Sequence, residues 1–254
     1  MTVVGLLHPG EMGSAIGAAL LGRGETVLWA SAGRSLATME RARRFGLEDA
    51  GDVAELCLRS EVVLSVCPPH VAVEVAEAAR DFDGIYVDAN AIAPETARRI
   101  GGLRTRFVDG GIIGPPPLEA GTTRLYLSGG EAEAVAELFA GTNVDARVIS
   151  DEPGAASALK MAFAGWTKGS AALLLAIRAL ARAEGVEDTL LAEWKISIPE
   201  LEEQSLATAA AARKKGWRWV GEMDEIARSM AAQDLPAGFH EGAAEIFRRT
   251  SGDS

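Results

Sequence analysis

The sequence is short of the residues from which metal centres and disulfide networks are built. Its 254 residues include two cysteines and three histidines, and Cys57 and Cys67 are not spaced as a C-x-x-C pair. Neither a zinc cluster nor a set of disulfides can be assembled from so few ligands. We therefore expect no metal site, and the free thiols favour a reducing, cytoplasmic location.

Positive charge and long apolar runs are also scarce. Lysine and arginine number 25 against 36 acidic residues, which gives a formal net charge of −11. Such a balance repels nucleic acid and anionic lipid. The longest uncharged helical stretch, residues 169–177, is far shorter than the ~20 residues that span a membrane, and no targeting signal precedes the first apolar run. We expect a protein that binds neither nucleic acid nor membrane.

The first two dozen residues carry the strongest pattern. An apolar run at 3–7 stops at a glycine-containing turn, and small residues at helical spacing begin at Ser14. This order predicts a dinucleotide-binding βαβ unit, although the first glycine of the G-x-G-x-x-G fingerprint is replaced by a histidine. Amides at the start of the helix would attract a pyrophosphate. The residues that we predict to contact the cofactor in this turn are His8, Pro9, Gly10, Glu11 and Met12.

The end of the second predicted strand, residues 25–30, indicates which dinucleotide binds. A NAD site carries a carboxylate there for the ribose hydroxyls, whereas this chain has a hydroxyl and a guanidinium. Arginine donors match the geometry of a 2′-phosphate, which favours NADP(H). The predicted cofactor-binding residues of this loop are Ser31, Gly33, Arg34 and Ser35. The alternative is that Arg34 is only a solvated loop charge.

Strands and helices alternate along the first 150 residues, which predicts a mostly parallel sheet of the Rossmann type. Further strands are expected at 61–67, 85–90, 106–109, 123–128 and 147–150, and residues 110–117 are expected to form an irregular loop because of their glycines and prolines. From 151 onward the composition is helical, beginning with a long helix at 153–184. We predict an α/β domain at 1–150 that binds NADP(H), followed by an all-α domain at 151–254 for substrate binding and dimerisation.

Together these motifs resemble the β-hydroxyacid dehydrogenase superfamily, the relatives of 6-phosphogluconate and 3-hydroxyisobutyrate dehydrogenases and of imine reductases. The matching segments are 5–13, 33–35, 65–69, 87–90 and 109–114, with Gly154 and Lys160 after them. The C-terminal segment, with Trp217, Trp219 and Phe239, is similar to a short helical domain of a less-characterised branch.

The resemblance implies roles for individual residues. Lys160 would be the catalytic lysine, and Asn90 would lie near the nicotinamide. Further cofactor contacts would come from Cys67, Pro68 and Pro69. The substrate would be bound by Gly111, Ile112, Ile113, Gly114 and Ala164. Two of these depart from the family, which usually has serine in place of Ile113 and asparagine in place of Ala164.

The sequence therefore predicts an NADP(H)-dependent oxidoreductase that transfers hydride between nicotinamide and a small-to-medium carbonyl or hydroxy compound, with Lys160 as general acid or base. Two alternatives stay open. One is an imine reductase of the same superfamily, and the other is a non-catalytic sensor that binds NADPH. The resemblance also implies a homodimer that pairs through the long helix.

Overall fold

The computed structural model describes residues 1–252 and divides into two compact units, residues 1–160 and the residues from 161 onward. The division lies ten residues beyond the expected boundary at 150, between Lys160 and Met161 inside helix α7 (Ala155–Ala183). The reason is that the first residues of α7 are hydrogen-bonded to the sheet of the first unit.

The first unit is built on an eight-stranded sheet in the order β3-β2-β1-β4-β5-β6-β7-β8. Its strands are β1 (Val3–Leu7), β2 (Thr26–Trp29), β3 (Glu48–Asp49), β4 (Val62–Ser65), β5 (Ile85–Asp88), β6 (Phe107–Ile113), β7 (Thr123–Ser128) and β8 (Val144–Ser150). All neighbours are parallel except β6 and β7, so the predicted mostly parallel sheet is confirmed. The chain adds β2 and β3 on one side of β1 and β4 on the other. This reversal makes a topological switch point between β1 and β4, where such sheets bind ligands.

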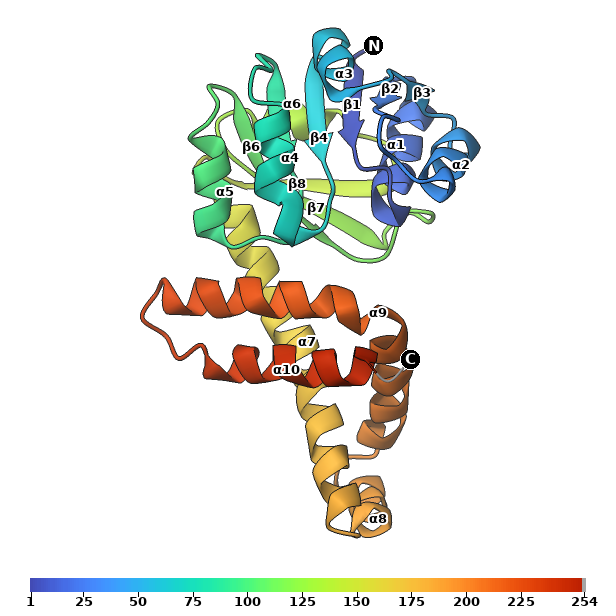
Figure 1. Cartoon of the computed structure of the whole chain (residues 1–254), viewed down its shortest axis with the longest axis vertical. Helices are drawn as coiled ribbons and strands as arrows, with labels where there is room; N and C mark the ends of the chain where they lie inside the picture. Colours follow the sequence, from blue (N-terminus) through green and yellow to red (C-terminus); the bar gives the residue numbers. More distant parts are fainter. Residues whose placement is uncertain (253–254) are drawn as a thin grey trace. The chain divides into compact units, whose positions relative to one another are not determined.

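Helices cover both faces of the sheet (Figure 1). They are α1 (Glu11–Arg23), α2 (Leu36–Arg44), α3 (Val53–Arg59), a 3₁₀ turn η1 (Pro69–Val71), α4 (Ala72–Ala78), α5 (Pro94–Gly101) and α6 (Ala132–Glu137). Successive strand residues point to opposite faces, so Leu6 packs with α1 and α6 while Leu7 packs with α3, α4 and α5. Two hydrophobic cores therefore hold the strands from both sides.

The expected strands of this unit and the helix beginning near Ser14 are present, with three differences. The two-residue strand β3 and helix α3 were not predicted, because they are too short to show a period. The prediction of an irregular loop at 110–117 is wrong for its first half, because β6 continues to Ile113. A Cβ at Gly111 would lie 2.7 Å from the Ala156 carbonyl oxygen, so this glycine allows a close backbone approach and does not break the strand.

The second unit is helical, as expected. It contains the rest of α7 with α8 (Glu187–Ser197), α9 (Glu200–Ala231) and α10 (Gly238–Gly252), and the last part of α9 lies beside α10 (Figure 1). Phe247 is buried and packs edge-on against Trp219. Within the described residues, no helix is both long and apolar enough to cross a membrane.

Candidate active site

The glycine turn lies directly after β1, at the switch point of the sheet. The Ser14 hydroxyl donates to the Pro9 carbonyl at 2.9 Å and fixes the turn. A Cβ at Gly13 would lie 2.7 Å from the His8 carbonyl oxygen, so this position needs glycine. A Cβ at Gly10 would meet nothing within 4 Å. The backbone at Gly10 is therefore open on the side where a phosphate would approach the start of α1.

One side chain of this turn and one of the loop after β2 have polar atoms that are buried and have no partner. They are Nδ1 of His8 and Nε of Arg34. His8 also has a backbone φ of 67°, in the left-handed region where glycine is usual. Burial, with a smaller contribution from Arg34, lowers the pKa of His8 to about 4. Unsatisfied polar atoms of this kind fit a site that receives an anionic group.

The loop after β2 and helix α2 add further polar groups to the same edge. Ser35 caps α2, since its hydroxyl accepts a hydrogen bond from the Thr38 amide at 3.3 Å. The Ser31 hydroxyl lies 3.5 Å from the Gly51 carbonyl oxygen, and Gly33 has a positive φ. Arg41 of α2 donates to the Pro9 carbonyl at 3.4 Å. Sequence reasoning missed Arg41, because nothing in its helix links it to a turn more than thirty residues earlier.

Asn90 is buried at the end of β5, and its side chain is fully engaged. Its Oδ1 accepts from the Cys67 amide at 2.5 Å, and its Nδ2 donates to Ser65 and Asp88, each at 3.0 Å. This network ties the ends of β4 and β5 together, ahead of Pro68 and Pro69. Burial raises the pKa of the Cys67 thiol to about 12. We conclude that Asn90 shapes the edge of the sheet through the loop at Cys67.

Asp109, in the middle of β6, anchors the start of α7. Its Oδ2 accepts from the Ser128 hydroxyl and from the amides of Gly154 and Ser157 at 2.9–3.0 Å, and its Oδ1 accepts from the Ser157 hydroxyl at 2.5 Å. The carboxyl group is fully buried, and burial raises its pKa against the lowering effect of these bonds. One side chain thus satisfies several amides at the helix N-terminus. Sequence reasoning noted Asp109 only as part of a motif and missed Ser128 and Ser157.

Lys160 lies one turn after this anchor and reaches the carboxyl end of β6. Its Nζ donates to the Ile112 carbonyl at 2.8 Å. The Ile112 side chain packs in the core, so this residue offers its carbonyl to the site and not its side chain. A Cβ at Gly111 would lie 3.2 Å from the Lys160 Cβ, so the glycine leaves room for the lysine. Gly114, with φ 126°, ends the strand.

The remaining predicted substrate residues are Ile113, which is buried, and Ala164. Ala164 follows Lys160 by one turn of α7, belongs to the second unit and is also buried. Within the first unit, the structure thus brings the glycine turn, Arg34, Asn90 and Lys160 to one edge of the sheet.

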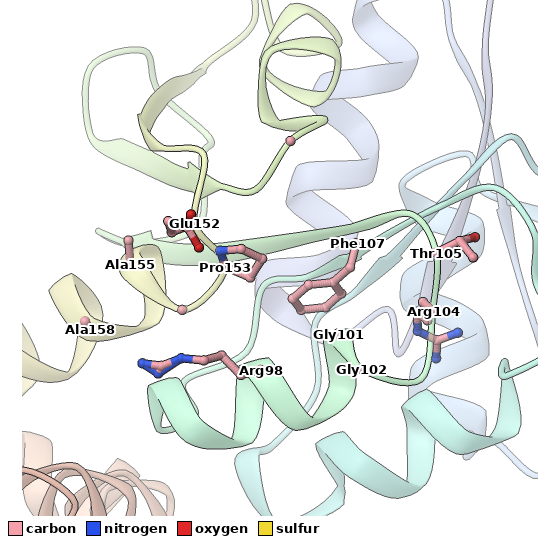
Figure 2. Close-up of a pocket in the computed structure, with 12 residues that line it drawn as sticks. Arg98, Gly101, Gly102, Arg104, Thr105, Phe107, Glu152, Pro153, Ala155 and Ala158 are labelled. Carbon is pink, nitrogen blue, oxygen red and sulfur yellow. The ribbon is translucent and has the colours of Figure 1, made fainter.

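A cavity of about 700 Å³ lies elsewhere in the first unit (Figure 2). It is lined by Arg98 and Phe107 on one side and by Glu152 and Pro153 on the other. Phe107 is the first residue of β6, so the cavity lies at the amino end of this strand, away from the edge that holds Lys160. None of the predicted site residues lines it.

A comparison with protein families matches residues 181–250 to a domain of unknown function, DUF1932. An uncharacterised 28.5 kDa protein from the 7S RNA 5′ region of Methanothermus fervidus is 33% identical over 164 residues. That match spans 63% of this chain and 63% of the relative's length.

Solved structures match over nearly the whole chain. A conserved protein of unknown function, whose structure is similar to 3-hydroxyacid dehydrogenases, is 29% identical with a TM-score of 0.72, over 98% of this chain and 97% of that chain. The 3-hydroxyisobutyrate dehydrogenase of Mycobacterium tuberculosis, solved with L-serine, is 19% identical with a TM-score of 0.73, over 100% and 94%. A reductive aminase from Aspergillus terreus, in complex with NADPH and ethyl levulinate, is 20% identical with a TM-score of 0.62, over 100% and 95%. The solved structures similar to this chain thus include a 3-hydroxyisobutyrate dehydrogenase and a reductive aminase, and the fold implied by the resemblance of the motifs is confirmed.

Proposed function

We propose that this chain is an NADP(H)-dependent oxidoreductase that moves a hydride between the nicotinamide ring and a carbon of a small-to-medium carbonyl or hydroxy compound. The observation that carries this proposal is the position of Lys160. Its ammonium group lies on the Ile112 carbonyl, at the same carboxyl edge of the sheet as the glycine turn after β1. The resemblance to dehydrogenases and reductases supports it further.

The residues at this edge fit a phosphorylated dinucleotide. The amides at the start of α1 would bind the pyrophosphate, whereas the Gly10 amide donates to the His8 carbonyl at 2.7 Å. The buried, unpartnered Nε of Arg34 would bind a 2′-phosphate, which NADP(H) has and NAD(H) lacks. NADPH in the reductive aminase of the same fold supports this choice.

Lys160 would act on the substrate oxygen. When bound, the nicotinamide supplies or accepts the hydride. An ammonium at Nζ can give up its bond to the Ile112 carbonyl and donate to the oxygen of a carbonyl as negative charge develops there. In the opposite direction the neutral amine would accept the proton of a hydroxyl group. A role of this kind contributes about 10² to 10⁴ in rate.

The substrate is expected to be partly apolar. Ile113 stands where the resemblance expects a serine, and Ala164 where it expects an asparagine, so two polar groups that could bind a small acid are replaced by aliphatic ones. We propose weak or no activity on 3-hydroxyisobutyrate and 6-phosphogluconate, and better activity on a larger ketone or aldehyde. The same two replacements favour the second candidate, the reduction of imines, which the similarity to a reductive aminase also supports.

The test is NADPH oxidation with ketones, aldehydes, ketoacids and cyclic imines, combined with a binding titration. We expect Lys160→Ala to lower kcat/KM at least ~100-fold while the Kd for NADPH changes less than ~3-fold, because the lysine acts on the substrate and not on the cofactor. Lys195→Ala, an exposed lysine of α8, is the matched control. Full turnover by Lys160→Ala would contradict the assignment. Turnover of imines alone would select the second candidate, and tight NADPH binding without any turnover would favour a sensor.

A further inference from the structure

His8 occupies a backbone position that a histidine adopts at a cost. Its φ of 67° lies in the left-handed region, and the dinucleotide fingerprint has a glycine at this place. Histidine tolerates this region better than most residues, yet the conformation is uncommon for any residue with a side chain. A strained residue that persists beside a binding site indicates that its side chain is used.

The surroundings of the imidazole indicate what it is used for. Nδ1 of His8 and Nε of Arg34 are both buried and unpartnered, and the two side chains are close enough for Arg34 to disfavour a charged imidazole. A guanidinium nitrogen is only a donor, and an imidazole nitrogen becomes one when protonated. One group with several acceptor oxygens, placed between them, would satisfy both atoms.

The other charged or titratable groups around His8 do not supply a negative charge between His8 and Arg34. Arg41 of α2 is a second cation at the turn, bound to the Pro9 carbonyl. Cys67, at the end of β4, lies near Arg34, and burial raises its pKa to about 12, so its thiol is neutral. Glu11 begins α1 and is exposed to solvent. The nearest charges that act on the imidazole are therefore positive.

We propose that His8, together with Arg34, binds the 2′-phosphate of NADP(H) and takes up a proton from solvent when this phosphate binds. The proposal rests on the proposed function, since it assigns one residue of the same cofactor site. In the free protein, burial beside Arg34 holds the pKa of His8 near 4, so the imidazole is neutral at pH 7. A phosphate dianion at hydrogen-bond distance reverses this preference, because an opposite charge favours the protonated form. NADH has no 2′-phosphate and should bind without this uptake.

Isothermal titration calorimetry of the full chain with NADPH and NADH tests this. Titrations at pH 7 in two buffers of different ionisation enthalpy give the number of protons taken up on binding. His8→Asn keeps a side chain that tolerates a positive φ but cannot titrate, and His8→Gly restores the residue of the fingerprint. His70→Asn, an exposed histidine, is the matched control.

We expect wild type to take up more protons with NADPH than His8→Asn does. This difference between the two proteins also removes the proton that the 2′-phosphate itself releases. Both His8 variants should lose ~10-fold in NADPH affinity, the size of one charge-assisted contact, and keep NADH affinity within ~3-fold. His70→Asn should match wild type, and circular dichroism should show that all variants are folded.

Two results would overturn the proposal, and only one of them would also overturn the proposed function. Equal proton uptake by wild type and His8→Asn, with NADPH still bound in preference to NADH, would remove His8 from the phosphate site and leave the proposed function standing. Failure of the wild-type chain to bind NADPH would overturn the cofactor of the proposed function and this inference together.

Discussion

Asp88 and Asp109 are buried carboxyl groups at paired register positions of β5 and β6. Burial raises the pKa of Asp88 to about 7, and the neighbouring Asp109 adds to this shift. Between its ordinary pKa of 3.8 and about pH 7, the native chain therefore binds more protons at this site than the unfolded chain does. The stability that Asp88 contributes is present at low pH and is lost as the pH rises toward 7.

His8 affects the pH dependence of stability in the opposite direction, over nearly the same pH range. Its pKa falls from 6.5 to about 4, so its contribution is present above pH 6.5 and is lost as the pH falls toward 4. We expect the two effects to oppose each other between pH 5 and 7. Hydrogen bonds from Arg182 and Arg178 lower the pKa of Glu187 to about 2. Its contribution to stability therefore changes only below pH 4.5, its ordinary pKa, and does not affect the range from pH 5 to 7.

Removing His8 should therefore expose the effect of Asp88. In His8→Asn we expect the free energy of unfolding to fall from pH 5 to pH 7 by up to about 1 kcal/mol per pH unit, while wild type varies less. Urea denaturation at pH 5, 6 and 7 measures this. The double variant His8→Asn with Asp88→Asn is the control and should lose the slope. A flat profile in His8→Asn alone would contradict the role of Asp88.

Individual site residues could be predicted from the sequence where they belong to a short motif. His8 and Arg34 could be proposed from the sequence because His8 follows one apolar strand directly and Arg34 lies in the loop after the next. Arg41 and Ser157 were missed, because each acts on a backbone or carboxyl group more than thirty positions away, and such pairs leave no periodic signal. Asn90 near the cofactor stays a prediction, and the partners of its side chain amide, Cys67, Ser65 and Asp88, could not be read from the sequence.

Among the elements, the contact between β6 and α7 matters most for the position of Lys160. Asp109 is the link, since it satisfies the Gly154 and Ser157 amides and the hydroxyls of Ser128 and Ser157. An alanine would leave these buried donors without a partner. An asparagine would keep the Oδ2 contacts and could donate its amide to the Ser157 hydroxyl, which can accept.

We therefore expect Asp109→Ala to lower the free energy of unfolding by about 2–4 kcal/mol and Asp109→Asn by less than about 1 kcal/mol. Chemical denaturation of the full chain measures both. The asparagine variant is the matched control, because it keeps the size of the side chain and the Oδ2 contacts while it removes the charge and reverses the Ser157 hydroxyl bond. Equal losses in the two variants would show that the charge matters and not the hydrogen bonds.

Strands with an apolar period were predictable at the element scale, and those with glycines were not. Gly110 and Gly111 suggested a loop, yet they lie in β6, where a Cβ would crowd the backbone of β5 or of α7. The sequence pattern cannot distinguish a glycine that breaks a strand from one that lets another backbone come close. The long helix at 153–184 was predicted within a few residues, because a period sustained over many turns is a strong signal.

For the whole molecule, the exposed face of α7 supports the proposed homodimer. Its large apolar side chains recur at intervals of three and four or their sum, and so share one side of the helix. They are Phe163, Trp166, Leu173, Ile177 and Leu180, and Trp166 is 76% exposed. An apolar stripe of this length marks an interaction surface, and two copies of one helix can present it to each other.

We expect light scattering to give the mass of a dimer at micromolar concentration. Leu173→Glu should shift the chain toward monomer, because a carboxylate in an apolar interface is costly. Leu36→Glu is the matched control, since Leu36 is equally an exposed leucine on a helix, α2, of the first unit. A wild-type monomer at micromolar concentration would contradict the homodimer.

Burial raises the pKa of Cys67 to about 12 and of Cys57 to about 11, and this also makes both thiols unreactive at neutral pH. Only a thiolate attacks disulfides and alkylating reagents, and at neutral pH almost none is present at either position. Labelling of these thiols should therefore wait until the sheet around β4 or helix α3 opens. The rate at which a thiol reagent reacts with Cys57 would then report local opening at α3, and the rate at Cys67 would report opening after β4. A ligand bound beside Cys67 would lower the second rate.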